Sequence, residues 1–228
     1  MTAAVAEPHL TSERLLDAAE RLFAERGVDA VSVRAVNAAA GANVAAVHYH
    51  FGSKDALVEA VLRRRMDVLG ERRRAMLATL PTDEPPAVRA VIAVLVLPLA
   101  ELSADPDSAG RAYVRFLATL EGGGPDTRAL LGSAFAPQFG PLDAALARAL
   151  PDLAAPVRHF RLALVGSNVL KTLADPELAA TTLLGAPDPV DHAAVVDALL
   201  DAVTGALAAP VTTDPHPGHL ATPEGTRT

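Results

Sequence analysis

Cysteine is absent from this 228-residue chain, which excludes disulfide bonds, thiol catalysis and cysteine-ligated zinc. Aromatic residues are scarce, at 4% of a chain that is 50% hydrophobic. Alanine, leucine and valine must therefore fill the core. This composition, with glycine and proline falling mostly between periodic stretches, predicts an all-α fold.

Long apolar runs and a secretory leader are also missing. The longest run, Ala90 to Ala100, has eleven residues and contains Pro98, so it is too short to span a bilayer. The N-terminus lacks the basic stretch and apolar segment of a secretory signal. We therefore expect a soluble, cytoplasmic protein. No H-E-x-x-H, phosphate loop or dinucleotide fingerprint occurs, so we expect no catalytic residue, cofactor or metal site.

The net charge of −7 is unusual for a nucleic-acid binder, which commonly has a basic surface. The acidity is unevenly distributed, because residues 1–80 hold 11 basic and 10 acidic side chains whereas residues 81–228 hold 9 and 17. Residues 30–65 contain five basic and two acidic side chains. The N-terminal part is thus locally positive, which is compatible with DNA binding.

Helix breakers divide the chain into a head and a body between two polar ends. We expect a flexible leader at 1–10, a head at 11–58 whose last helix continues to about 80, a helical body at 59–209 and a disordered tail at 210–228. Within the head, Thr11 or Ser12 can cap the first helix. The other predicted helices start at Ser32, Asn43 and Ser53 and, after a proline-rich linker at 81–86, occupy 87–103, 109–121, 126–149, 152–174 and 189–208.

Residues 32–58, SVRAVNAAAGANVAAVHYHFGSKDALV, predict a helix, a glycine turn, a short second helix and the start of a third. Gly41 suits the tight turn because glycine accepts positive φ. Such a helix-turn-helix carries its second helix into the major groove of DNA. The head would be packed by Val36, Ala40, Val47 and Phe51.

These residues resemble the DNA-binding head of the TetR (tetracycline-repressor-like) family of transcriptional regulators. The resemblance covers roughly residues 12–62. Two positions depart from the family pattern: Asn37 replaces a small apolar residue, and Asn43 replaces the commoner Ser or Thr cap. The matching elements are the first helix at 15–27, Ser32, Ala38-Ala39-Ala40-Gly41, His48-Tyr49-His50-Phe51 and Gly52-Ser53-Lys54-Asp55-Ala56-Leu57.

The resemblance implies DNA-binding roles in the head. Arg34 would reach a base edge, where arginine paired with guanine is worth about 1–3 kcal/mol of discrimination. Small apolar side chains would meet thymine methyl groups, and polar ones would contact phosphates or bases. The implied set is Ser32, Arg34, Asn43, Val44, Ala45, Ala46, His48, Tyr49, His50 and Lys54.

Other polar residues of the head have plainer interpretations. His48 and His50, two positions apart on a helix, point in divergent directions, so a metal site is not expected there. The arginine triplets at 63–65 and 72–74 are interpreted as a solvated face of the fourth helix. The first triplet alternatively lies near the DNA backbone.

For the body, the resemblance implies a homodimer built from the helices at 152–174 and 189–208. Their small residues, Ala163, Gly166 and Ser167 in one and Ala194, Ala198, Ala202 and Gly205 in the other, favour close approach of helices, although they could equally face the monomer core. The middle helices would enclose a cavity for a hydrophobic or amphipathic effector. Its candidate lining, for which ordinary core packing is the alternative, is Leu95, Leu99, Tyr113, Phe116, Leu120, Leu131, Phe135 and Phe139, with His159 or Asn168 as a polar tether.

The function predicted from the sequence is a ligand-responsive repressor, not an enzyme, that a small effector releases from a palindromic operator in double-stranded DNA. One alternative is a helical dimeric protein-interaction module without specific DNA binding. A second is an enzyme that uses the helical body and keeps the head as a relic.

Overall fold

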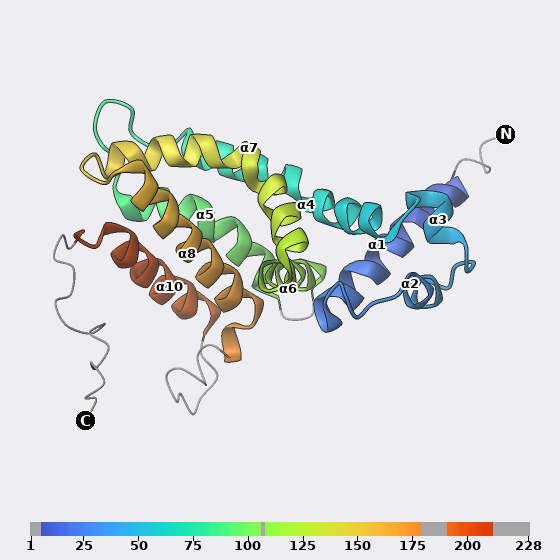
Figure 1. The fold of residues 1–228 in the computed structure, drawn as a ribbon. Helices are drawn as coiled ribbons and strands as arrows, with labels where there is room; N and C mark the ends of the chain where they lie inside the picture. Colours follow the sequence, from blue (N-terminus) through green and yellow to red (C-terminus); the bar gives the residue numbers. More distant parts are fainter. Residues whose placement is uncertain (1–5, 106–107, 179–190, 212–228) are drawn as a thin grey trace, which may run out of the picture.

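The protein is described by a computed structural model that places residues 6–105, 108–178 and 191–211. These residues form helices and connecting turns without a strand, so the predicted all-α class is confirmed. Figure 1 shows an elongated molecule in which the head, at one end, is joined to the body by one long helix, α4. The helices are α1 (Ala6–Arg26), α2 (Val33–Ala39), α3 (Ala46–Phe51), α4 (Lys54–Leu77), α5 (Val88–Ser103), α6 (Ala109–Gly122), α7 (Pro125–Ala149), α8 (Ala155–Ala174) and α10 (His192–Ala208).

The predicted start of the first helix was wrong. α1 begins at Ala6, so residues 6–10 are helical, and Thr11 and Ser12 lie inside the helix rather than at its cap. Pro8 permits this start because the N–H that proline lacks has no partner in the first turn of a helix. Residues 1–5 of the expected leader and 212–228 of the expected tail lie outside the described residues.

Two contacts join the head to the body. The ring of Phe23 in α1 stacks on that of Phe116 in α6, with centroids 5.9 Å apart. The hydroxyl of Tyr113, also in α6, donates to the backbone carbonyl of Leu62 in α4 at 2.7 Å. Because all four side chains are buried, α6 packs closely against both α1 and α4.

The helices of the body follow their predicted ranges to within a few residues, and residues 189–190 of the last one lie outside the described part. The linker between α4 and α5 is held in place, because Nη2 of Arg148 donates to the carbonyl oxygens of Pro81, Thr82 and Glu84 at 2.6, 3.0 and 2.8 Å. None of the described helices combines the length and hydropathy that a membrane crossing needs.

Candidate nucleic-acid interface and ligand cavity

The turn of the helix-turn-helix contains Gly41, whose φ is +58°. A Cβ at this position would lie 2.8 Å from Nη2 of Arg14. That guanidinium nitrogen donates to the carbonyl of Ala40 and, at 3.3 Å, to the carbonyl of Gly41. The turn therefore favours glycine for its left-handed backbone, whereas the end of the flexible Arg14 side chain could move to admit a Cβ.

Asn37, one of the two departures from the family pattern, links the helices on either side of this turn. It is buried; its Nδ2 donates to the carbonyl of Val44 at 2.6 Å, and its Oδ1 accepts from the backbone N–H of Val47 at 3.1 Å. The N–H of Val47 belongs to the first turn of α3, where helical partners are missing. A single amide thus fixes the start of α3 against α2.

The caps of α2 and α4 follow the prediction, and that of α3 does not. The hydroxyls of Ser32 and Ser53 accept from backbone N–H groups at 3.2 and 3.1 Å. Asn43 instead accepts from the N–H of Ala45 at 3.0 Å, in a turn that precedes α3. Because this side chain closes a local turn, the helix begins at Ala46 rather than at the predicted position.

Most of the predicted DNA-binding side chains share the outer surface of this helix pair. Val44 is 69% exposed and Tyr49 is 82% exposed. Ala46 was predicted wrongly, since it is 7% exposed and packs inward at the first turn of α3. The side chains that reach the surface are Ser32, Arg34, Asn43, Ala45 and His48, and His50 and Lys54 are partly exposed.

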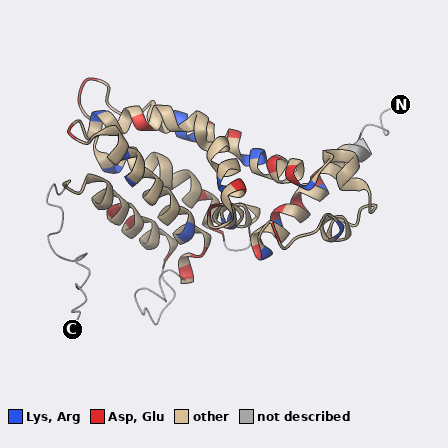
Figure 2. Ribbon diagram, in the orientation of Figure 1, with Lys and Arg blue, Asp and Glu red and all other residues tan. Residues whose placement is uncertain are grey.

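The surface of α3 carries no charged side chain, and Figure 2 shows this helix without Lys, Arg, Asp or Glu. His48 donates to its own C-terminal turn, with Nδ1 3.0 Å from the carbonyl oxygen of Gly52. Positive charge is supplied from the flanks, by Arg34 on α2 and by Lys54 at the N-terminus of α4. The described part of the chain holds no cluster of three or more His, Asp or Glu residues suited to a metal ion.

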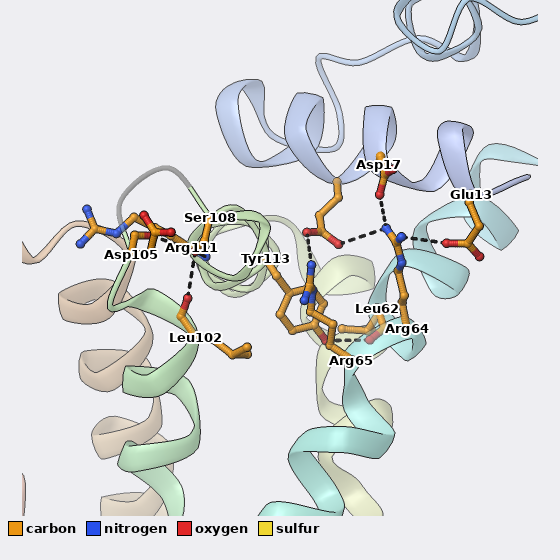
Figure 3. A network of polar contacts seen from close by, with 11 residues as sticks. Glu13, Asp17, Leu62, Arg64, Arg65, Leu102, Asp105, Ser108, Arg111 and Tyr113 are labelled. Carbon is orange, nitrogen blue, oxygen red and sulfur yellow. Dashed lines mark hydrogen bonds and ion pairs between the residues drawn. The ribbon is translucent and has the colours of Figure 1, made fainter. Parts of the chain in front are cut away.

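A charged network fastens α4 to α1, as Figure 3 shows. Arg64 pairs with Glu13 at 2.8 Å and with Asp17 at 2.6 Å, and Arg65 pairs with the buried Glu20 at 3.3 Å. Burial raises the pKa of Glu20 although both arginines lower it. These two arginines are therefore not on the solvated face predicted for them.

The body contains a cavity of about 370 Å³ lined by α4, α5, α7 and α8 and by Glu121 at the end of α6, within the usual range for small-molecule sites. Figure 1 shows that α7 is bent; Pro137 and Pro141 lie inside that helix, and proline is a common cause of such bends. Of the predicted lining residues, six border the cavity: Leu95, Leu99, Leu131, Phe135, Phe139 and His159.

Four predicted lining residues lie elsewhere. Tyr113, Phe116 and Leu120 are fully buried on the faces of α6 that pack against other helices. Asn168 is exposed, and its Nδ2 donates to the carbonyl of Leu164 in its own helix at 2.9 Å. The cause is the direction of α6, whose aromatic side chains face the head. The small residues Ala163, Gly166 and Ser167, predicted for the dimer interface, border the cavity.

The sequence interpretation missed the polar residues of the cavity. Arg73 and Gln138 lie at one part of its wall, and Glu121 and Arg128 also line it. Glu121 accepts from the hydroxyl of Ser167 at 2.7 Å and lies 3.7 Å from the ammonium of Lys171. No sequence signal separates Arg73 from its neighbours Arg72 and Arg74, because only the packing of α4 against α7 shows which one faces inward.

The outer faces of α8 and α10 carry an apolar surface. Phe160 and Leu164, one helical turn apart on α8, are 66% and 50% exposed. The exposed side of α10 is formed largely by small residues, namely Ala194, Ala198, Ala202 and Gly205. The opposite side of α10 packs against α5 and α8 through Val196, Leu199, Leu200, Val203 and Leu207.

Comparison with known proteins gives matches in both parts of the chain. The family model described as "Bacterial regulatory proteins, tetR family" matches residues 15–61, and the one described as "Tetracyclin repressor-like, C-terminal domain" matches residues 93–206. The HTH-type transcriptional repressor KstR2 of Rhodococcus jostii is 42% identical over 65 residues, which cover 28% of this chain and 32% of that protein. The match spans about a third of this curated relative.

Solved structures resemble the whole fold. The fatty acid degradation regulator FadR from Bacillus halodurans superposes with a TM-score of 0.62 at 15% identity, covering 86% of this chain and 95% of that one. FadR from Bacillus subtilis, solved in complex with stearoyl-CoA, gives 0.58 at 14% identity, covering 85% and 98%. At these identities the likeness concerns the arrangement of helices.

Proposed function

Because this chain belongs to the tetR family of bacterial regulatory proteins, we propose that it is a DNA-binding repressor whose affinity for its operator is lowered by a small effector. The observation that carries the proposal is the outward face of α3. Tyr49 on this helix and Val44 in the turn before it are large side chains left 82% and 69% exposed, and Asn37 binds the backbone of Val44 and Val47 from the buried side. Exposed apolar and aromatic groups at such a position mark a binding surface.

We assign sequence recognition to α2 and α3 together. Arg34 would pair with guanine, while Val44 and Ala45 would contact thymine methyl groups. Phosphate contacts from Ser32, Lys54 and the ring edge of Tyr49 would set affinity and its salt dependence. Ala46 is left out of this surface because it is buried.

We further propose that two chains pair through the outer faces of α8 and α10. Phe160 and Leu164 would be buried away from water in the dimer, and the small residues of α10 permit close helix packing. A symmetric pair of heads would read a palindromic site twice. The acidic side chains Asp197 and Asp201 are already paired with Arg89 of α5, which limits repulsion at the rim.

The effector would act through α4. Arg73 and Leu77 of this helix line the cavity, while Arg64 and Arg65 of the same helix tie it to α1. A ligand that fits the cavity better when α4 is displaced would shift the population toward heads misplaced for DNA, by no more than its differential affinity. The apolar lining suits an amphipathic molecule, and stearoyl-CoA, found with the Bacillus subtilis regulator, is of that kind.

The test is selection of binding sites from randomised duplex DNA, followed by titration of the selected site. We expect a palindrome, and a large fall in affinity as salt is raised. Arg34→Ala should relax the preference at one base pair per half-site by about 1–3 kcal/mol. Arg72→Ala, which removes an exposed arginine of the body, is the matched control.

If no palindrome is selected, or if binding is insensitive to salt, the protein-interaction alternative replaces the repressor. If the Arg34→Ala variant keeps full sequence preference, the assignment of residues to base recognition is wrong even though the proposed function stands.

A further inference from the structure

Arg73 is a buried cation at the wall of an apolar cavity. Its side chain is 4% exposed and its guanidinium lies 5.1 Å from the centre of the Phe135 ring. Nη1 donates to the amide oxygen of Gln138. Nε and Nη2 are enclosed and have no hydrogen-bond partner among the described residues. Two of the three guanidinium nitrogens thus have no hydrogen-bond acceptor among the described residues.

This arrangement is costly in the absence of a ligand. Burial lowers the pKa of Arg73 to about 10, so the group is still charged at neutral pH. Buried charges are normally paired, because leaving their donors unsatisfied has a large desolvation penalty. The carboxylate in the same cavity, that of Glu121, accepts from Ser167 through Oε1, while Oε2 makes no hydrogen bond among the described residues but lies 3.7 Å from the ammonium of Lys171. Glu121 thus has a cationic counter-ion, whereas no ion pair of Arg73 occurs among the described residues.

The geometry of the free donors identifies the missing partner. Nε and Nη2 form the side-on fork of a guanidinium, which fits the two oxygens of a carboxylate. Two other arginines of this chain use this same pair of nitrogens: Arg72 binds Glu101 at 3.2 and 2.7 Å, and Arg158 binds Asp143 at 2.7 and 3.1 Å. In Arg73 the same two nitrogens have no hydrogen-bond partner among the described residues.

We propose that the effector is an amphipathic carboxylic acid whose carboxylate occupies the fork of Arg73 while its apolar body fills the cavity. The assignment rests on the proposed function, since it takes the cavity as the effector site. Both fork nitrogens are enclosed, so the carboxylate enters only when the Gln138 side chain or the Phe135 ring moves aside. Both belong to α7, and entry therefore changes the contact between α7 and α4.

The test is calorimetric titration of the protein, without DNA, with three probes that share one tail: dodecanoate, dodecanol and dodecylamine, each below its micellar concentration. We expect dodecanoate to bind about 10- to 100-fold more tightly than dodecanol. The carboxylate makes charge-assisted hydrogen bonds with the buried guanidinium, which the uncharged hydroxyl of dodecanol lacks. Dodecylamine should bind most weakly, since its charge repeats that of Arg73.

Arg73→Met separates this proposal from a purely structural role. It keeps an apolar stem and removes a charge with unsatisfied donors, so its thermal midpoint should be equal to or above that of the wild type. We expect it to lose the preference for dodecanoate over dodecanol while keeping its affinity for dodecanol. Arg72→Met, which changes the preceding residue of α4 on its outer surface, should leave both affinities unchanged.

The proposal is overturned if dodecanoate and dodecanol bind the wild type equally, if none of the probes binds, or if Arg73→Met keeps the preference. Operator binding is measured in a separate experiment. Carboxylate-selective binding by a protein that selects no operator leaves this proposal standing and removes the repressor, whereas operator binding with no carboxylate preference does the reverse.

Discussion

Replacing Asn37 by alanine tests how the recognition helix is held. The change removes the 2.6 Å bond to the carbonyl of Val44 and the 3.1 Å bond from the N–H of Val47. The Val47 bond is buried, so its N–H is left without a partner at about 1–3 kcal/mol; the Val44 bond is partly buried and contributes about 0.5–1.5 kcal/mol. We expect a total loss of roughly 2–4 kcal/mol, a large part of the stability of an ordinary domain.

Urea denaturation followed by circular dichroism measures this loss, and thermal unfolding should show a midpoint lower by roughly 4–16 °C. Asn43→Ala is the control, because it removes one exposed bond to a neighbouring N–H and should cost well under 1 kcal/mol. Hydrogen exchange should be faster specifically at the amide of Val47. If Asn37→Ala is no less stable than Asn43→Ala, the amide does not hold α3, and the reasoning is refuted.

Three further changes probe other parts of the molecule. Lys54→Gln should weaken binding to all duplex sequences alike and lower the slope of log affinity against log salt by about one; an unchanged slope removes this lysine from the phosphate contacts. Gly41→Ala should lower the unfolding free energy by about 1–2 kcal/mol or more, while Gly132→Ala, at an open helical position of α7, should raise it by about 0.5–1 kcal/mol; equal effects would contradict the turn geometry. Hydrogen bonding from Arg158 lowers the pKa of Asp143 in the folded protein below its ordinary value of 3.8. The stabilisation of the fold by this pair is therefore fully present above about pH 3.8 and is lost as the pH falls through the lowered pKa of the folded protein. Acid titration of stability below about pH 4 should therefore be shallower in Asp143→Asn, and parallel curves would exclude the pair.

The sequence determined the features that depend on short stretches of chain. Ser32 and Ser53 cap their helices because a hydroxyl accepts from an N–H three residues ahead, whatever surrounds it. Gly41 takes a positive φ because the turn needs one. The helices of the body were predicted to within a few residues, since apolar periodicity and prolines mark them locally. The all-α class follows from these signals together.

Which side of each helix faces which neighbour follows from the packing of distant segments and could not be predicted from local signals. Arg72 and Arg73 are adjacent and alike, yet one pairs with Glu101 on the surface and the other is buried beside a cavity. Tyr113 and Phe116 are aromatic like Phe135, but α6 turns them toward the head while α7 turns Phe135 into the cavity. The reason is that apolar periodicity predicts which face of a helix is buried but not which other helix packs against that face. The packing partner depends on how distant segments come together.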